Sequence, residues 1–331
     1  MARSSRLGRA ALRWTVWIAC AFLPRIATAD AMLYVTNMPT SGSWEILRYN
    51  ATTGVSAGRF ATLPGDSFGV AAGPDGNIYV SNFGNYRVDR YNGVTGAFMN
   101  TFATMSGAYG NPYDITFGPD GNLYVGMSVG DVLKFNGTTG ASLGRFTQAP
   151  SGVFGFGGMA FRGDKFFVSY GGSGSGNNGK LYSYNATTGG DSQLIYGSFS
   201  NNGPHSPVFD AAGNVYVPDY QTTKILKFTA STYTLSGTIT TVSPWALDFN
   251  PAGELLVLTD NGSSSTIRRY DSASGSFLGT LVQSGSAGLG RGFTLSQIIP
   301  IPEVDPAGIP SVMMLVAGSL SILGRRRLPR R

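Results

Sequence analysis

Residues 118–125 have the sequence Gly-Pro-Asp-Gly-Asn-Leu-Tyr-Val, and the arrangement around this stretch returns along the whole chain. Its Pro and Gly residues favour a tight turn, because Pro sets φ and Gly accepts a positive φ. Leu123–Met127 is rich in strand-forming residues without polar alternation, which predicts a strand buried on both faces. Tyr113–Phe117 before it, and Val132–Asn136 and Ser142–Thr147 after it, complete a unit of four expected strands.

The unit occurs six times. Its third strand carries an aromatic residue near its end, and consecutive copies of this residue lie between 42 and 49 positions apart: Tyr49, Tyr91, Phe135, Tyr184, Phe228 and Tyr270. Its second strand is equally recognisable, at Leu33-Tyr34-Val35, Ile78-Tyr79-Val80, Leu123-Tyr124-Val125, Phe166-Phe167-Val168, Val215-Tyr216-Val217 and Leu255-Leu256-Val257. Four strands repeated with this period predict the blades of a β-propeller.

The two ends of the array indicate how the ring closes. The first unit opens directly on its second strand at Leu33, whereas the sixth unit is followed by one spare strand over residues 292–297. This strand aligns with residues 112–117 and 244–249, the first strands of other units. We expect it to complete blade 1 and leave no open sheet edge. The predicted fold is therefore an all-β, six-bladed propeller of four-stranded blades over residues 30–298.

The repeated Gly-Pro-Asp-Gly-Asn-apolar-Tyr-Val pattern resembles NHL-repeat propellers and their SMP-30/gluconolactonase-like relatives. The resemblance covers about residues 30–298 and implies the six-bladed fold. It implies function only weakly, since one fold carries many functions.

The basic composition comes from the ends of the chain. Ten of the 24 Lys and Arg residues lie in residues 1–29 and 325–331, while all 18 Asp and Glu lie between Asp30 and Asp305. The body between the two ends is therefore acidic, with 14 basic against 18 acidic residues. This balance gives no support to nucleic-acid binding.

Residues 1–29 have the pattern of a secretion signal. A basic segment precedes the apolar Trp14–Leu23, and Ala27-Thr28-Ala29 offers a cleavage site. The alternative is a transmembrane helix, but ten apolar residues are too few to span about 30 Å of hydrocarbon. Cleavage would also remove Cys20, the only Cys in the chain. We expect an exported protein without disulfides.

The C-terminal end predicts a sorting and anchoring segment. A linker over residues 299–308 carries Pro302, Glu303 and Pro306, an apolar helix is expected over Ile309–Gly324, and residues 325–331 form an Arg-rich tail that begins with Arg325, Arg326 and Arg327. The arginines would stay in the cytoplasm and the body outside. This layout resembles the sorting signal of PEP-CTERM proteins, which implies an exosortase-like processing enzyme as partner and a cell-surface or matrix location. The usual Pro-Glu-Pro is here Pro302-Glu303-Val304, and a plain C-terminal anchor is the alternative.

One position of the repeat gathers ring side chains. Alignment on the first strands places Phe68, Tyr113, His205, Trp245 and Phe293 at it, while the fourth unit has Gly157 there with Phe156 beside it. Sixfold placement would put these rings around one mouth of the channel, where flat aromatic faces can stack on sugars or apolar ligands. The alternative is that the rings pack each blade against the next.

The sequence favours a binding or scaffold module over an enzyme. The mature chain has a single His, His205, which excludes a site of three His. Resemblance to SMP-30-like lactonases implies a metal held by Glu, Asn and Asp, but no Glu stands at a matching place. We assign no catalytic residue, metal ligand or cofactor. Ca²⁺ is the ion that would suit the oxygen ligands Asn37, Asn82, Asn111, Asp219 and Asp260 near the loops. The expected partners are polysaccharide or another surface protein; a metal-dependent lactonase or lyase is the alternative.

Overall fold

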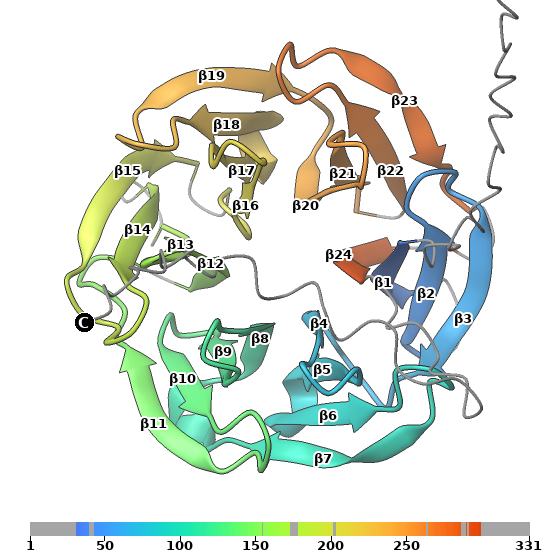
Figure 1. The fold of residues 1–331 in the computed structure, drawn as a ribbon, viewed down its shortest axis with the longest axis vertical. Helices are drawn as coiled ribbons and strands as arrows, with labels where there is room; N and C mark the ends of the chain where they lie inside the picture. Colours follow the sequence, from blue (N-terminus) through green and yellow to red (C-terminus); the bar gives the residue numbers. More distant parts are fainter. Residues whose placement is uncertain are drawn as a thin grey trace, which may run out of the picture.

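The computed structural model describes residues 31–39, 43–153, 155–172, 178–200, 203–262, 264–285, 289 and 291–298. Six four-stranded antiparallel sheets stand around one axis, each with its first strand nearest the axis and its fourth strand outermost (Figure 1). The predicted six-bladed propeller is therefore confirmed.

Each blade follows the same strand order. Blade 1 consists of β24 (Arg291–Ile298), β1 (Met32–Met38), β2 (Glu45–Asn50) and β3 (Ser56–Thr62). Blade 2 consists of β4 (Val70–Ala72), β5 (Ile78–Asn82), β6 (Arg87–Tyr91) and β7 (Phe98–Thr104). Blade 3 consists of β8 (Pro112–Phe117), β9 (Leu123–Met127), β10 (Val132–Phe135) and β11 (Ser142–Thr147).

Blade 4 consists of β12 (Phe156–Arg162), β13 (Lys165–Tyr170), β14 (Gly179–Asn185) and β15 (Gln193–Phe199). Blade 5 consists of β16 (Val208–Phe209), β17 (Val215–Asp219), β18 (Lys224–Phe228) and β19 (Leu235–Thr240). Blade 6 consists of β20 (Pro244–Phe249), β21 (Leu255–Asp260), β22 (Ser265–Tyr270) and β23 (Phe277–Val282). Single turns of 3₁₀ helix, which the strand pattern does not predict, lie at Phe83–Asn85, Gly107–Tyr109 and Tyr220–Thr222.

The hydrophobic core is divided among the interfaces between blades. Every residue of β5, β9, β17 and β21 is buried, as expected for a strand covered on both faces. Alternate residues of β1 face opposite neighbours: Leu33 and Val35 pack with blade 6, whereas Tyr34 packs with blade 2. Because neighbouring blades share their cores, a single blade cannot bury its own apolar faces.

Closure joins the two ends of the array. The backbone of β24 pairs antiparallel with β1 from Met32↔Ile298 to Met38↔Arg291, and the two strands lie side by side in Figure 1. The strand extends one residue beyond each end of the expected 292–297. Blade 1 is thus built from both ends of the propeller, which leaves its inner strand paired rather than open.

The turn between the first and second strands holds its blade together. In blade 3 the Asp120 carboxylate accepts hydrogen bonds from the Tyr124 hydroxyl at 3.0 Å and the Asn122 side chain at 2.8 Å, and it pairs with Lys134 at 2.8 Å. Although partial burial opposes it, this set of donors lowers the pKa of Asp120. Asp75 in blade 2 is held in the same way, by Asn77, Tyr79 and Arg90. The repeated Asp-Gly-Asn-apolar-Tyr pattern therefore has a structural use in each of these blades.

One expected boundary moves by a residue. The third strand of blade 3 ends at Phe135 rather than Asn136, because the Asn136 side chain accepts hydrogen bonds from the backbone N–H groups of Thr138 and Thr139 at 3.0 and 2.9 Å. Such an Asx contact begins a turn and ends the strand.

The expected targeting segments lie outside the described residues. These are the signal peptide over residues 1–29, most of the linker over 299–308, the apolar helix over 309–324 and the tail over 325–331. Within the part of the chain that the structure does describe, no helix is long and apolar enough to cross a membrane.

Candidate functional site

In blades 1, 3 and 6 the ring position of the repeat coincides with a β-bulge in the inner strand, whereas Phe68 and His205 lie just before β4 and β16. The register of β20 with β21 passes from Pro244 directly to Ala246 and so skips Trp245, and the register of β24 with β1 skips residue 293 in the same way. The bulge in β8 covers Tyr113 and Asp114. A bulge inserts an extra residue and turns its side chain away from the regular alternation. At Tyr113 and Trp245 this local geometry turns the ring toward the cavities at the propeller axis.

Hydroxyl groups of the preceding blade hold the backbone at three of the ring residues. Thr36 donates to the carbonyl of Phe68 at 3.3 Å, Ser81 to that of Tyr113 at 2.8 Å, and Ser169 to that of His205 at 2.8 Å. The three donors occupy the same position of the second strand, after the Tyr-Val or Phe-Val pair. Each bond therefore fixes the backbone of one ring residue from the neighbouring blade.

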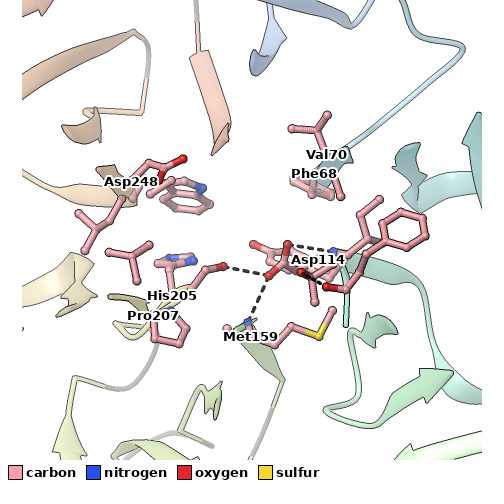
Figure 2. Close-up of a pocket in the computed structure, with 18 of the residues that line it drawn as sticks. Phe68, Val70, Asp114, Met159, His205, Pro207 and Asp248 are labelled. Atoms are coloured by element: carbon pink, nitrogen blue, oxygen red, sulfur yellow. Dashed lines mark hydrogen bonds between the residues drawn. The ribbon is translucent and has the colours of Figure 1, made fainter. Parts of the chain in front are cut away.

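The rings form two close pairs on opposite sides of the axis, one stacked and one tilted. Phe68 and Tyr113, from blades 2 and 3, stack with centroids 5.0 Å apart and planes at 19°. His205 and Trp245, from blades 5 and 6, lie 4.3 Å apart with planes at 37°. Figure 2 shows Phe68 and His205 facing each other from opposite walls. The structure brings these four rings together at one cavity, where they also make contacts between neighbouring blades.

Two cavities meet at these rings. Tyr113, Gly157, His205 and Trp245 line both, and we call these four residues the neck. The mouth lobe, of about 390 Å³, adds Phe83, Ser128, Phe156, Tyr220 and Gln221 from loops at one face of the propeller. The inner lobe, of about 350 Å³, adds Phe68, Val70, Asp114, Met159, Ser206 and Asp248 along the inner strands. Both volumes fall in the range of small-molecule sites.

Blade 4 departs from the ring pattern for a steric reason. A Cβ on Gly157 would lie 2.2 Å from the carbonyl oxygen of Pro204, so the neck position of this blade cannot carry a ring without movement of the backbone. Phe156 instead covers Gly126 of blade 3, where a Cβ would meet the Phe156 ring at 2.1 Å. Phe156 is buried and still lines the mouth lobe. It is therefore mainly a contact between blades.

Asp114 is the carboxylate at the centre of the inner lobe (Figure 2). One oxygen accepts hydrogen bonds from the Ser206 hydroxyl at 3.0 Å and the Met159 N–H at 3.2 Å, and the other accepts from the Ile115 N–H at 2.9 Å. Burial raises the pKa of Asp114 to about 6, against the opposite effect of these donors. The carboxylate thus joins blades 3, 4 and 5 and presents a negative charge inside the channel. Sequence analysis did not single it out.

His205 contributes an imidazole ring to the neck. Burial lowers its pKa to about 4, so the imidazole is neutral at pH 7. Its Nε2 is shielded from solvent and has no hydrogen-bond partner among the residues that the structure describes. A neutral ring in this place acts as a flat surface with one polar edge.

The oxygen ligands proposed for Ca²⁺ are engaged in separate contacts. Asn82 donates to Asp89 at 3.0 Å, Asn111 donates to the Phe83 carbonyl at 2.8 Å, and Asp219 accepts from the Ser200 N–H at 3.2 Å. Asn37 donates to Glu45 at 3.0 Å, and Asp260 accepts from the Gly262 N–H at 3.0 Å. Within the described ranges, no group of three His, Cys, Asp or Glu side chains gathers as a metal site would require.

Several predicted residues cannot be placed. The side chain of Phe293 and the sorting-motif residues Pro302, Glu303, Pro306, Arg325, Arg326 and Arg327 lie outside what the structure describes. Their roles stay predictions.

Comparison with known proteins supports the fold. No protein-family model and no curated protein matches the sequence. Among solved structures, the chain is similar to one in the crystal structure of a nidogen/laminin complex, with 14% identity, a TM-score of 0.64, and coverage of 80% of this chain and 97% of the other. It is also similar to a protein of unknown function from Bacteroides caccae, with 15% identity, a TM-score of 0.61, and coverage of 82% and 99%. At these identities the similarity concerns the fold.

Proposed function

We propose that this chain is an exported cell-surface or matrix protein whose propeller is a noncatalytic binding module, and that polysaccharide binds in the mouth lobe. The observation that carries the proposal is the set of rings around that lobe. Tyr113, Tyr220 and Trp245 are only partly buried, and they line it together with Gln221 and Ser128. Ring faces beside polar edges suit the apolar faces and hydroxyl groups of sugars.

The charge of the mouth lobe supports a neutral ligand. Its described lining contains no Asp, Glu, Lys or Arg, and His205 is neutral at pH 7. A similar fold occurs in the nidogen/laminin complex, so a surface protein is the second ligand class that the same mouth would serve.

Export belongs to the same proposal and rests on the sequence. The signal-like residues 1–29 and the variant sorting motif at Pro302-Glu303 fit a chain that an exosortase-like enzyme processes at the membrane. Expression of the full chain in a bacterium that makes exopolysaccharide, with and without its exosortase gene, tests this part. A mature chain of unchanged mass in both strains would contradict processing.

Binding is tested on the purified chain by affinity electrophoresis in gels that contain soluble bacterial exopolysaccharides. We expect Tyr220→Ala and Trp245→Ala to weaken retardation about tenfold each, because each removes one stacking face. Phe98→Ala is the matched control, since Phe98 is 54% exposed on the outer strand β7. Unchanged retardation of both mouth variants, with native circular dichroism, would refute the proposal.

A further inference from the structure

The inner lobe differs from the mouth lobe in its charge. Asp114 and Asp248 both line it, and no Lys or Arg is among its described lining residues. The neighbouring His205 is neutral at pH 7, because burial lowers its pKa to about 4. The formal charges on the wall are therefore all negative, in a cavity shielded by apolar side chains such as Val70, Met159 and Leu247.

The same lobe is bounded by ring faces. Phe68 stacks on Tyr113 on one wall, and His205 lies in tilted contact with Trp245 on the opposite wall. The face of an aromatic ring carries partial negative charge and attracts cations, most strongly in surroundings from which water is excluded. The ring faces and the carboxylate thus both favour a positively charged ligand.

The position of the Asp114 carboxylate is fixed from three blades. Its bonds to the Ser206 hydroxyl, the Met159 N–H and the Ile115 N–H hold both oxygens at the wall. Ser206 is 92 positions away from Asp114 in the sequence. The equivalent positions of the other blades carry the uncharged residues Gly69, Gly158, Ser206, Ala246 and Thr294. A single charged side chain among these uncharged residues places one carboxylate where a ligand that passes the neck would meet it.

We propose that the inner lobe binds a small organic ammonium ion, with the rings of Tyr113 and Trp245 against the cation and the Asp114 carboxylate as its counter-ion. Ring faces suit a large, weakly hydrated cation better than a metal ion, which needs several converging oxygens. The cation enters through the mouth lobe, because the two lobes share the neck. This site is additional to polysaccharide binding and does not depend on it.

The test compares two probes of nearly equal shape on the purified full chain without polysaccharide. Choline carries the positive charge, and 3,3-dimethylbutan-1-ol is its neutral counterpart. By isothermal titration calorimetry, we expect choline to bind saturably and at least about tenfold more tightly than the alcohol. Equal affinities, or no saturable binding of choline, would overturn the proposal while leaving the polysaccharide test unaffected.

Two substitutions then locate the cation. Asp114→Asn and Tyr113→Leu should each weaken choline binding about tenfold or more, whereas Asp191→Asn should not, because Asp191 is an exposed turn residue outside both lobes. Circular dichroism shows whether each variant is folded. A folded Asp114→Asn protein that binds choline like the wild type would also overturn the proposal. If that variant does not fold, the comparison of the two probes on the wild type still decides whether the proposal holds.

Discussion

Asp114 and His205 both line the inner lobe, and burial moves their pKa values in opposite directions, to about 6 and about 4. Below pH 6 the folded state takes up a proton at Asp114 more readily than the unfolded chain, so acidification stabilises the fold through this group. Below pH 6.5 the unfolded chain protonates its His more readily than the folded state, so acidification destabilises the fold through His205. In the wild type these two effects oppose each other between about pH 6.5 and 4.

Substitution of either residue should expose the effect of the other. The quantity compared is the change in unfolding free energy when the pH falls from 7.5 to 5. Relative to the wild type, this change should be about 1–2 kcal/mol less favourable to the fold in Asp114→Asn and about 1–2 kcal/mol more favourable in His205→Phe. Urea unfolding at the two pH values measures both differences. The other carboxylates titrate alike in all three proteins, so identical pH dependence of the three would show that the shifts are absent.

At the scale of the element, the inner strand depends on a hydroxyl from its neighbour. Ser81 is fully buried in β5, donates to the Tyr113 carbonyl at 2.8 Å and accepts from the Gly69 N–H at 2.7 Å. Ser81→Ala would leave both backbone groups without this partner, which should lower the unfolding free energy by about 1–3 kcal/mol. Chemical denaturation at neutral pH measures the loss.

Ser183 provides the matched control. It is fully buried in β14, and its hydroxyl has no hydrogen-bond partner within the described structure. Ser183→Ala should therefore change stability by less than about 0.5 kcal/mol or increase it. Equal losses in the two variants would mean that the hydroxyl bond to the Tyr113 carbonyl does not hold the bulge.

At the scale of the whole molecule, stability depends on the pairing of β24 with β1. A chain that ends at residue 298 keeps all these pairs, whereas one that ends at residue 290 leaves β1 with an open edge and removes part of the cover of blade 6. We expect the longer chain to unfold in one cooperative transition. The shorter one should melt at least about 10 °C lower or fail to fold, as scanning calorimetry would show. Equal melting temperatures would contradict closure by this strand.

The sequence alone determined the propeller, its six blades and the place of the rings, because each of these follows from local features that repeat. The Gly-Pro-Asp-Gly turn and the fully apolar second strand specify one blade, and the repeat register carries Phe68, Tyr113 and Trp245 to equivalent positions. In blade 4 the repeat register did not decide whether Phe156 or Gly157 holds the ring position. The structure did, because a Cβ on Gly157 would clash with Pro204 and because the Phe156 ring packs on Gly126.

Only the tertiary structure decided what lies between the rings. Asp114 meets Met159 and Ser206, which are 45 and 92 positions away, because the inner strands of three blades converge on the axis. That convergence makes the lobe and buries Asp114 and His205 among protein atoms, which moves their pKa values. These pKa shifts depend on surroundings assembled from distant segments of the chain, so no local sequence pattern could predict them. The repeat thus specified the ring of blades, and the closure of that ring created the site.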